Sequence, residues 1–170
     1  MRRPSRRARI AIGTALGAVA VAVPLVAHEV SSPALDLRPA ARAADPACAR
    51  IADRYPDRVA GESRDPVSVT GVTSWGNGGV VLRCGLEPPD ETVDPCVEVD
   101  GVDWVFREDH STGSGYRVLI TYGRDPAVQA FVDDRITAID GVLVDLSDVV
   151  RPIGRAPDDA CVSTADATPR

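Results

Sequence analysis

The stretch VSVTGVTSWGNGGVVLRC, residues 67–84, sets the fold class of this chain. Apolar and polar residues alternate on both sides of the dipeptide Asn77-Gly78. That dipeptide favours a tight hairpin turn, because both of its residues tolerate the positive φ angles that such a turn needs. The pattern predicts two antiparallel strands, over residues 67–75 and 79–84.

The same strand-like alternation continues to residue 132. A second hairpin signal, Asp100-Gly101, separates the runs 97–99 and 102–106, and two further runs cover residues 116–122 and 127–132. Short alternating runs separated by turn residues are typical of antiparallel strands. We therefore expect about six short strands in this region.

Helical spacing brackets the strands on both sides. Asp45 is followed by Pro46, which suits an N-cap and the first helical position, and apolar residues then recur at helical spacing from Cys48. Residues 135–150 show the same spacing, although Gly141 leaves open a later start. The chain is thus predicted to form an α+β domain, an antiparallel sheet with an N-terminal and a C-terminal helix.

The chain opens with five arginines in its first nine residues, followed by an uncharged apolar run over residues 10–27. Eighteen apolar residues exceed the roughly 7 to 15 of a secretory signal and fall short of the roughly 20 of a membrane-spanning helix. We expect an apolar leader helix that is either cleaved or kept as an anchor. The predicted organisation is a signal peptide or anchor (1–28), a flexible linker (29–44), one globular domain (45–154) and an irregular tail tied by Cys161 (155–170).

Both interpretations of the leader place the remainder outside the cytoplasm, because positively charged flanks stay inside. Beyond residue 27, 14 arginines face 25 carboxylates, a balance that argues against a nucleic-acid partner. We expect contact with the membrane through residues 10–27 if the leader is uncleaved, and an envelope protein as the partner.

Four cysteines, Cys48, Cys84, Cys96 and Cys161, follow the leader. Export supplies an oxidising compartment, so we expect them to form two disulfides. The chain contains no C-x-x-C pair and only two histidines, and we therefore predict no metal site. No cofactor motif is present either, because the glycines near Asn77 precede a strand rather than a helix.

Catalytic groups are hard to single out in this sequence. His110 is the only histidine inside the predicted domain, and it lies in a polar loop. Acidic residues are abundant in turns and strands, where they ordinarily keep a surface soluble. Paired carboxylates for glycoside chemistry would have to come from Asp90, Glu91, Asp94, Glu98, Asp100, Asp103, Asp133 and Asp134. We assign no catalytic residue.

One set of residues is a candidate for binding: Trp75, Arg83, Trp104 and Arg124. Tryptophan and arginine are enriched where surfaces recognise partners. The competing interpretation is that both tryptophans fill the core of a domain that has few aromatic residues, and that the arginines pair with carboxylates.

Several of these motifs together resemble a known family. The segments Ser74-Trp75-Gly76, VVLRCG (80–85), VEVDGVDW (97–104) and Gly123-Arg124 are similar to the domain-of-unknown-function 3515 family of exported proteins from high-GC Gram-positive bacteria. The resemblance implies the disulfides Cys48–Cys84 and Cys96–Cys161. Loop entropy alone leaves open the alternative of Cys84–Cys96 with Cys48–Cys161.

These observations lead to one expected function and one alternative. We expect an extracytoplasmic domain, anchored or secreted, that acts without catalysis as a binding or scaffolding component of the cell envelope. The alternative is an envelope hydrolase that uses two carboxylates.

Overall fold

A computed structural model describes residues 38–156 and Cys161. The predicted leader helix and most of the predicted linker lie outside the described residues. The helices are α1 (Pro46–Ala52), α2 (Glu108–Ser111) and α3 (Ile139–Val150). The strands are β1 (Arg58–Val59), β2 (Glu62–Ser63), β3 (Val72–Trp75), β4 (Val80–Leu86), β5 (Cys96–Val99), β6 (Val102–Phe106), β7 (Tyr116–Tyr122) and β8 (Ala127–Asp133).

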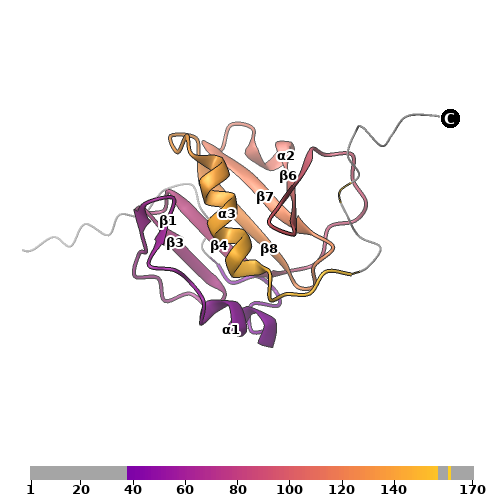
Figure 1. Ribbon diagram of the computed structural model, residues 1–170, viewed down its shortest axis with the longest axis horizontal. Helices are drawn as coiled ribbons and strands as arrows, with labels where there is room; N and C mark the ends of the chain where they lie inside the picture. Colours follow the sequence, from indigo (N-terminus) through magenta and orange to yellow (C-terminus); the bar gives the residue numbers. More distant parts are fainter. Residues whose placement is uncertain (1–37, 157–160, 162–170) are drawn as a thin grey trace, which may run out of the picture.

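Six strands form one antiparallel sheet in the order β3-β4-β8-β7-β6-β5, and β1 and β2 pair separately. The α+β prediction is thereby confirmed. Each hairpin expected from the sequence is present, but β8 lies between β4 and β7, so the chain returns to the middle of the sheet before it enters α3 (Figure 1). Among the described residues, no helix is both long enough and apolar enough to cross a membrane.

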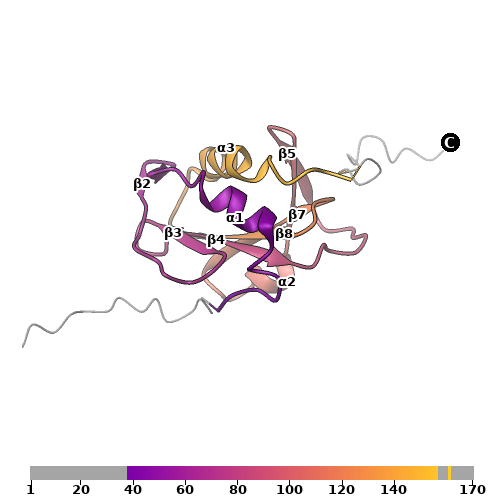
Figure 2. The same ribbon diagram turned by 90° about the horizontal axis from the view of Figure 1, so that it is seen from below.

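The main core lies between one face of the sheet and the helices α1 and α3 (Figure 2). Alternate residues of the strands, such as Leu82 and Ala130, point to this face and are fully buried. Ile51 of α1 and Leu146 of α3 meet them from above. The short helix α2 lies on the opposite face and contacts β7.

The starts of two elements and the structure of one loop differ from the sequence expectation. β3 begins at Val72 instead of residue 67, because the Val72 N–H donates to the Val69 carbonyl (3.1 Å) in a turn that takes the preceding segment out of the sheet. α3 begins at Ile139 instead of residue 135. The predicted polar loop around His110 forms α2. The hydroxyls of Ser111, its last residue, and of Thr112, its C-cap, each donate to a backbone carbonyl four residues earlier.

The folded part also begins earlier than residue 45. Ala40 and Ala43 are buried, and the Arg42 N–H donates to the Gly85 carbonyl (2.9 Å). Residues 38–44, which we assigned to the linker, therefore belong to the domain. Gly85 permits this approach, because a Cβ at this position would lie 2.4 Å from the Ala43 nitrogen.

Both disulfides match the pairing that the family resemblance implied. Cys48 of α1 joins Cys84 of β4, with Cα atoms 5.7 Å apart, and Cys96 of β5 joins Cys161, at 5.8 Å. These separations are typical of disulfides. The first bond pins α1 to the end of β4, and the second ties the tail to the edge strand β5.

The close approach at Gly85 gives a first prediction. Replacing Gly85 with Ala places a methyl group against residues 42–43 and also requires φ of +102°. We expect the free energy of unfolding to fall by about 2 to 4 kcal/mol, measured by urea denaturation.

Gly101→Ala is the matched control, because Gly101 also has positive φ but has no heavy atom within 4 Å of the added methyl. Its cost should be only about 1 to 2 kcal/mol, from the backbone alone. Equal losses in the two variants would contradict the account of Gly85.

Asp133 gives a second prediction, on pH. Its carboxylate accepts the Arg135 backbone N–H (2.8 Å) and two guanidinium bonds from Arg135 (2.9 and 2.6 Å). The Arg135 side chain lowers the pKa of Asp133 from 3.8 to about 2. Because the folded pKa is depressed, this carboxylate stabilises the fold above pH 4, and the contribution is lost as pH falls to about 2.

Asp133→Asn should therefore be less stable than the wild type at neutral pH, and the difference should shrink between pH 4 and pH 2. Chemical denaturation at each pH measures this difference. The neighbouring substitution Asp134→Asn serves as the control for a lost surface charge. If the difference in the free energy of unfolding between Asp133→Asn and the wild type stayed constant with pH, the linkage would be refuted.

Candidate binding site

The structure buries both tryptophans of the predicted binding set. Trp75 and Trp104 each have no exposed surface. The Trp75 indole N–H donates to the Pro56 carbonyl (3.0 Å), and the Trp104 indole N–H donates to the Ser147 hydroxyl (3.0 Å). Neither ring forms an exposed recognition surface. They fill the core instead, because this domain has few other large side chains to do so.

Arg124 links two backbone segments at one end of the sheet. It is buried, and its guanidinium donates to the backbone carbonyls of Gly101, Arg151 and Ile153. Burial lowers the pKa of Arg124, and the nearby Asp103 partly offsets this effect. Arg124 thus joins the β5–β6 turn to the segment after α3, and its charge is not presented to a partner.

Arg83 lies elsewhere, on the sheet face opposite the main core. It is half-buried in β4, beside Val72 of β3 and Gln129 of β8 in the sheet register. The four predicted binding residues therefore do not come together, since two lie in the core, one at the end of the sheet and one on the far face.

The candidate catalytic residues are also dispersed. His110 is exposed on α2, where its ring lies 3.6 Å from Asp109. Asp103 is buried and pairs with Arg155 (3.0 Å), and Asp133 pairs with Arg135. Among residues 38–156 and Cys161, no three His, Cys, Asp or Glu side chains are placed to hold a metal ion.

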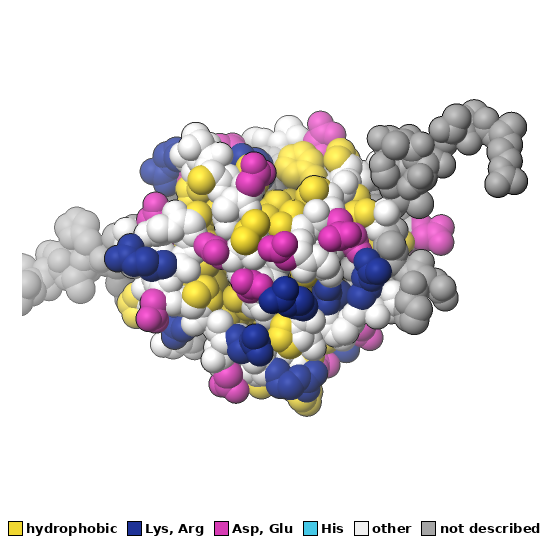
Figure 3. All heavy atoms as spheres, in the orientation of Figure 1, with side chains coloured by type: hydrophobic (Ala, Val, Ile, Leu, Met, Phe, Trp, Pro, Cys, Tyr) yellow, Lys and Arg dark blue, Asp and Glu magenta, His cyan; other side chains and the backbone are white. Residues whose placement is uncertain are grey.

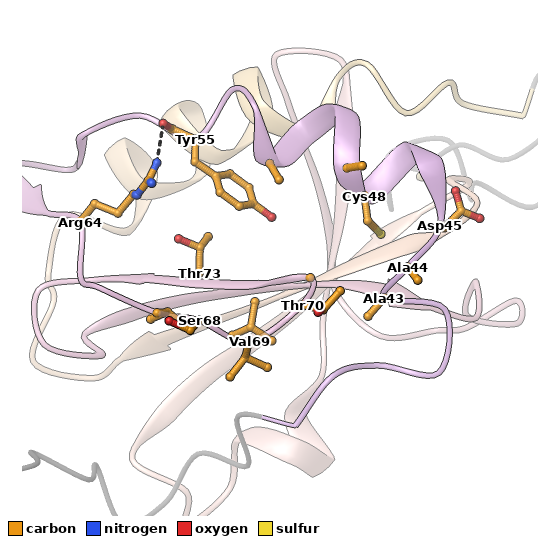
Figure 4. Close-up of a pocket in the computed structure, with 15 residues that line it drawn as sticks. Ala43, Ala44, Asp45, Cys48, Tyr55, Arg64, Ser68, Val69, Thr70 and Thr73 are labelled. Carbon is orange, nitrogen blue, oxygen red and sulfur yellow. Dashed lines mark hydrogen bonds between the residues drawn. The ribbon is translucent and has the colours of Figure 1, made fainter.

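A cavity of about 460 Å³ lies between α1 and the segment 67–73, beside the edge strand β3 (Figure 4). The end of α1 and Tyr55 form one wall, and the segment that leaves the sheet before β3 forms the other. Small aliphatic residues and polar side chains share its lining: Ala43, Ala44, Asp45, Cys48, Ala49, Ala52, Tyr55, Arg64, Val67, Ser68, Val69, Thr70, Gly71, Val72 and Thr73.

Tyr55 is the largest side chain of this lining. Its ring packs edge-on against Trp75, with centroids 6.1 Å apart, and points toward the strand below α1 (Figure 4). The hydroxyl is buried and has no hydrogen-bond partner among the described residues. Burial raises the pKa of Tyr55 to about 12, so this group stays protonated and can donate a hydrogen bond.

Two charged residues flank the cavity. One Arg64 nitrogen donates to the Tyr55 carbonyl (3.2 Å), while the side chain remains exposed. Asp45 has both oxygens engaged, one by the Ala47 N–H (2.8 Å) and the other by Arg42 (3.2 Å). The Ala47 N–H is the main cause that lowers the pKa of Asp45. The Asp45 carboxylate therefore serves as the cap of α1.

The sequence patterns did not indicate this cavity. Tyr55 has the spacing of an α1 residue, but α1 ends at Ala52, and Tyr55 instead reaches under the helix. Residues 67–70 alternate like a strand, and only Gly71 interrupts that pattern. A break in alternation before a strand is the one signal that could have pointed to this site.

Charges of both signs share the surface of the helix-covered side (Figure 3). Acidic side chains are interspersed with apolar ones in the middle of that view, and arginines gather toward its lower right. Residues 38–156 carry 13 arginines and 20 carboxylates in all. The domain is thus acidic overall, without a face of a single sign in this view.

One comparison with known proteins gave a match. The sequence model of a family described as "Protein of unknown function (DUF3515)" matches residues 9–157. Neither the curated proteins nor the solved structures contain a match to this chain. Since the family model covers most of the chain, including the apolar run 10–27, this protein belongs to the family Protein of unknown function (DUF3515).

Proposed function

We propose that this protein is an extracytoplasmic domain, held at the membrane by residues 10–27 or released after cleavage, that binds a ligand or partner in the cell envelope without catalysis. The observation that carries the proposal is the Cys48–Cys84 disulfide. It needs an oxidising compartment to form and persist, and Cys48 also lines the cavity beside β3.

Two further observations support the extracytoplasmic location. The second disulfide, Cys96–Cys161, leaves no described cysteine as a free thiol. The family match begins at residue 9, so the apolar run belongs to the unit that the family shares. A basic flank before such a run favours export of the residues after the run.

The lining of the cavity supports binding over hydrolysis. A glycoside hydrolase needs two carboxyl groups roughly 5 to 10 Å apart across a cleft. Asp45 is the only acidic residue of this cavity lining, and its two oxygens already accept bonds from Ala47 and Arg42. No specific observation therefore favours the hydrolase alternative.

Electrostatics support a protein partner for the domain surface. An excess of carboxylates over arginines repels polyanions such as nucleic acid. A scaffolding role at the envelope fits this acidic surface, because a partner protein can present basic side chains to it.

The redox state of the cysteines in cells tests the location. In intact cells quenched with acid, a maleimide polymer should add nothing to the full chain before reduction and four adducts after it. The physical reason is that both disulfides form only where thiols are not kept reduced.

A variant that lacks residues 1–27 is the control, since it should stay in the cytoplasm and gain four adducts without any reductant. Four adducts on the unreduced full chain would overturn the proposed location.

A further inference from the structure

We propose that the outer edge of β5 binds an extended, basic segment of another envelope protein, which adds a strand to the sheet. This inference rests on the proposed function, since it names the surface and the partner chemistry of that binding role. The sheet has two edge strands, β3 and β5, and they differ in what lies beside them.

The chain itself covers the outer side of β3. The Ser74 carbonyl accepts the Asp65 N–H (2.8 Å), and the Gly76 N–H donates to the Ser63 carbonyl (2.9 Å). Cover of this kind protects an edge strand from pairing with another chain.

The β5 edge has no such cover among the described residues. The Phe106 N–H donates to the Pro95 carbonyl (2.8 Å), so the odd-numbered residues of β5 direct their backbone groups toward β6. The N–H and C=O groups of Cys96 and Glu98 therefore point outward. They form no hydrogen bond with a described residue. Their spacing is that of the ladder bonds which one added antiparallel strand would make.

The Cys96–Cys161 disulfide leaves β5 from a face of the sheet and not from this edge. Cys96 packs with Val105 and Ile120 on the face opposite the main core. Side chains stand roughly perpendicular to the plane in which strands pair. The disulfide and an added strand would therefore contact different sides of β5.

Apolar side chains favour contact on the helix-covered face of β5. Val97 and Val99 share that face, where Val99 packs against the core while Val97 is 45% exposed. The exposed large hydrophobic side chains of residues 38–156 and Cys161 are Val93, Val97 and Val144. Two of them thus lie in or just before β5, and the third lies on α3, which contacts β5. An apolar side chain on the added strand would cover Val97.

Charge favours a basic partner for this edge. Residues 87–103 contain no arginine and seven carboxylates: Glu87, Asp90, Glu91, Asp94, Glu98, Asp100 and Asp103. Arginines from elsewhere in the domain pair with Glu87, Asp94 and Asp103. The other four carboxylates are exposed and form no ion pair with a described residue. Complementary charge on the partner would also speed its association.

The same charges argue against a second copy of this chain as the partner. Antiparallel self-pairing centred on Val97 would place Asp94 of one copy opposite Asp100 of the other, at both ends of the pair. Like charges directly opposite each other destabilise paired strands. A foreign strand of alternating basic and apolar residues avoids this repulsion, because its basic side chains would lie beside Glu98 and its apolar ones beside Val97.

Titration of the full-length oxidised chain with the acetylated hexapeptide amide RVRVRV tests the proposal. Calorimetry should show binding, and exchange of the Cys96 and Glu98 amide hydrogens should slow roughly tenfold or more at saturation. The same peptide with every backbone nitrogen methylated keeps its charge but has no N–H donor. It should bind roughly tenfold more weakly or worse.

Two variants at one position separate backbone from charge. Glu98→Gln keeps the outward N–H and should weaken RVRVRV binding only about threefold. Glu98→Pro also removes that N–H, and it spares the bonds to β6 because proline is tolerated where an edge N–H faces outward. Its affinity should fall roughly tenfold below that of Glu98→Gln. Glu62→Gln is the matched control, since Glu62 is an exposed carboxylate of β2, and its affinity should equal that of the wild type.

The proposal is overturned if RVRVRV produces no binding heat or if the methylated peptide binds equally well. Slow exchange of the Glu98 amide in the free chain would overturn it too, because the edge would then be covered by the chain itself. A dimer that Glu98→Pro dissociates, observed by analytical ultracentrifugation, would assign the edge to a second copy and would contradict the proposed partner. None of these outcomes alters the cysteine alkylation result, so the two proposals can fail separately.

Discussion

The Cys48–Cys84 disulfide joins a seven-residue helix to the end of β4, and this side of the domain depends on that bond. Isolated helices this short are unstable in water. α1 buries only Ala47, Cys48 and Ile51, too little to hold it alone. Closing a loop with a sequence separation of 36 stabilises the fold by about 4 kcal/mol in chain-entropy terms. The disulfide therefore supplies much of what fixes α1 over the sheet.

The neighbouring residue of β4 completes this junction. At Gly85 the backbone of residues 42–43 passes so close that only a residue without a side chain fits. Together the disulfide and this contact fix the N-terminal segment, α1 and the end of β4 as one unit. The cavity lies between α1 and residues 67–73, and Cys48 is part of its lining, so its shape depends on the same junction. The position of α1 and the shape of the cavity therefore depend on the same two features, the disulfide and the close approach at Gly85.

The sequence predicted the features that neighbouring residues determine, and it missed the features that depend on contacts between distant residues. Alternation and the turns at Asn77-Gly78 and Asp100-Gly101 identified the hairpins, because neighbouring residues determine them. The burial of Ala40 and Ala43 depends on contact with Gly85, which is distant in sequence. The predicted linker, 29–44, therefore includes residues that belong to the domain. Composition could not decide between core and surface for Trp75 and Trp104. The cavity arises because α1 ends at Ala52 and the chain turns at Val69. Periodicity does not mark the first event, and only the break at Gly71 marks the second.

Hydrogen exchange of the Cys48→Ala/Cys84→Ala double variant tests the central claim most directly, that this disulfide fixes α1 on a sheet that is otherwise stable. The amides of Ala49 and Asp53, which bond within and at the ends of α1, should exchange almost as fast as in an unfolded peptide. Those of Leu82, Leu119 and Ala130 in the sheet should remain protected. Retained protection in α1, or loss of protection throughout the sheet, would contradict the account.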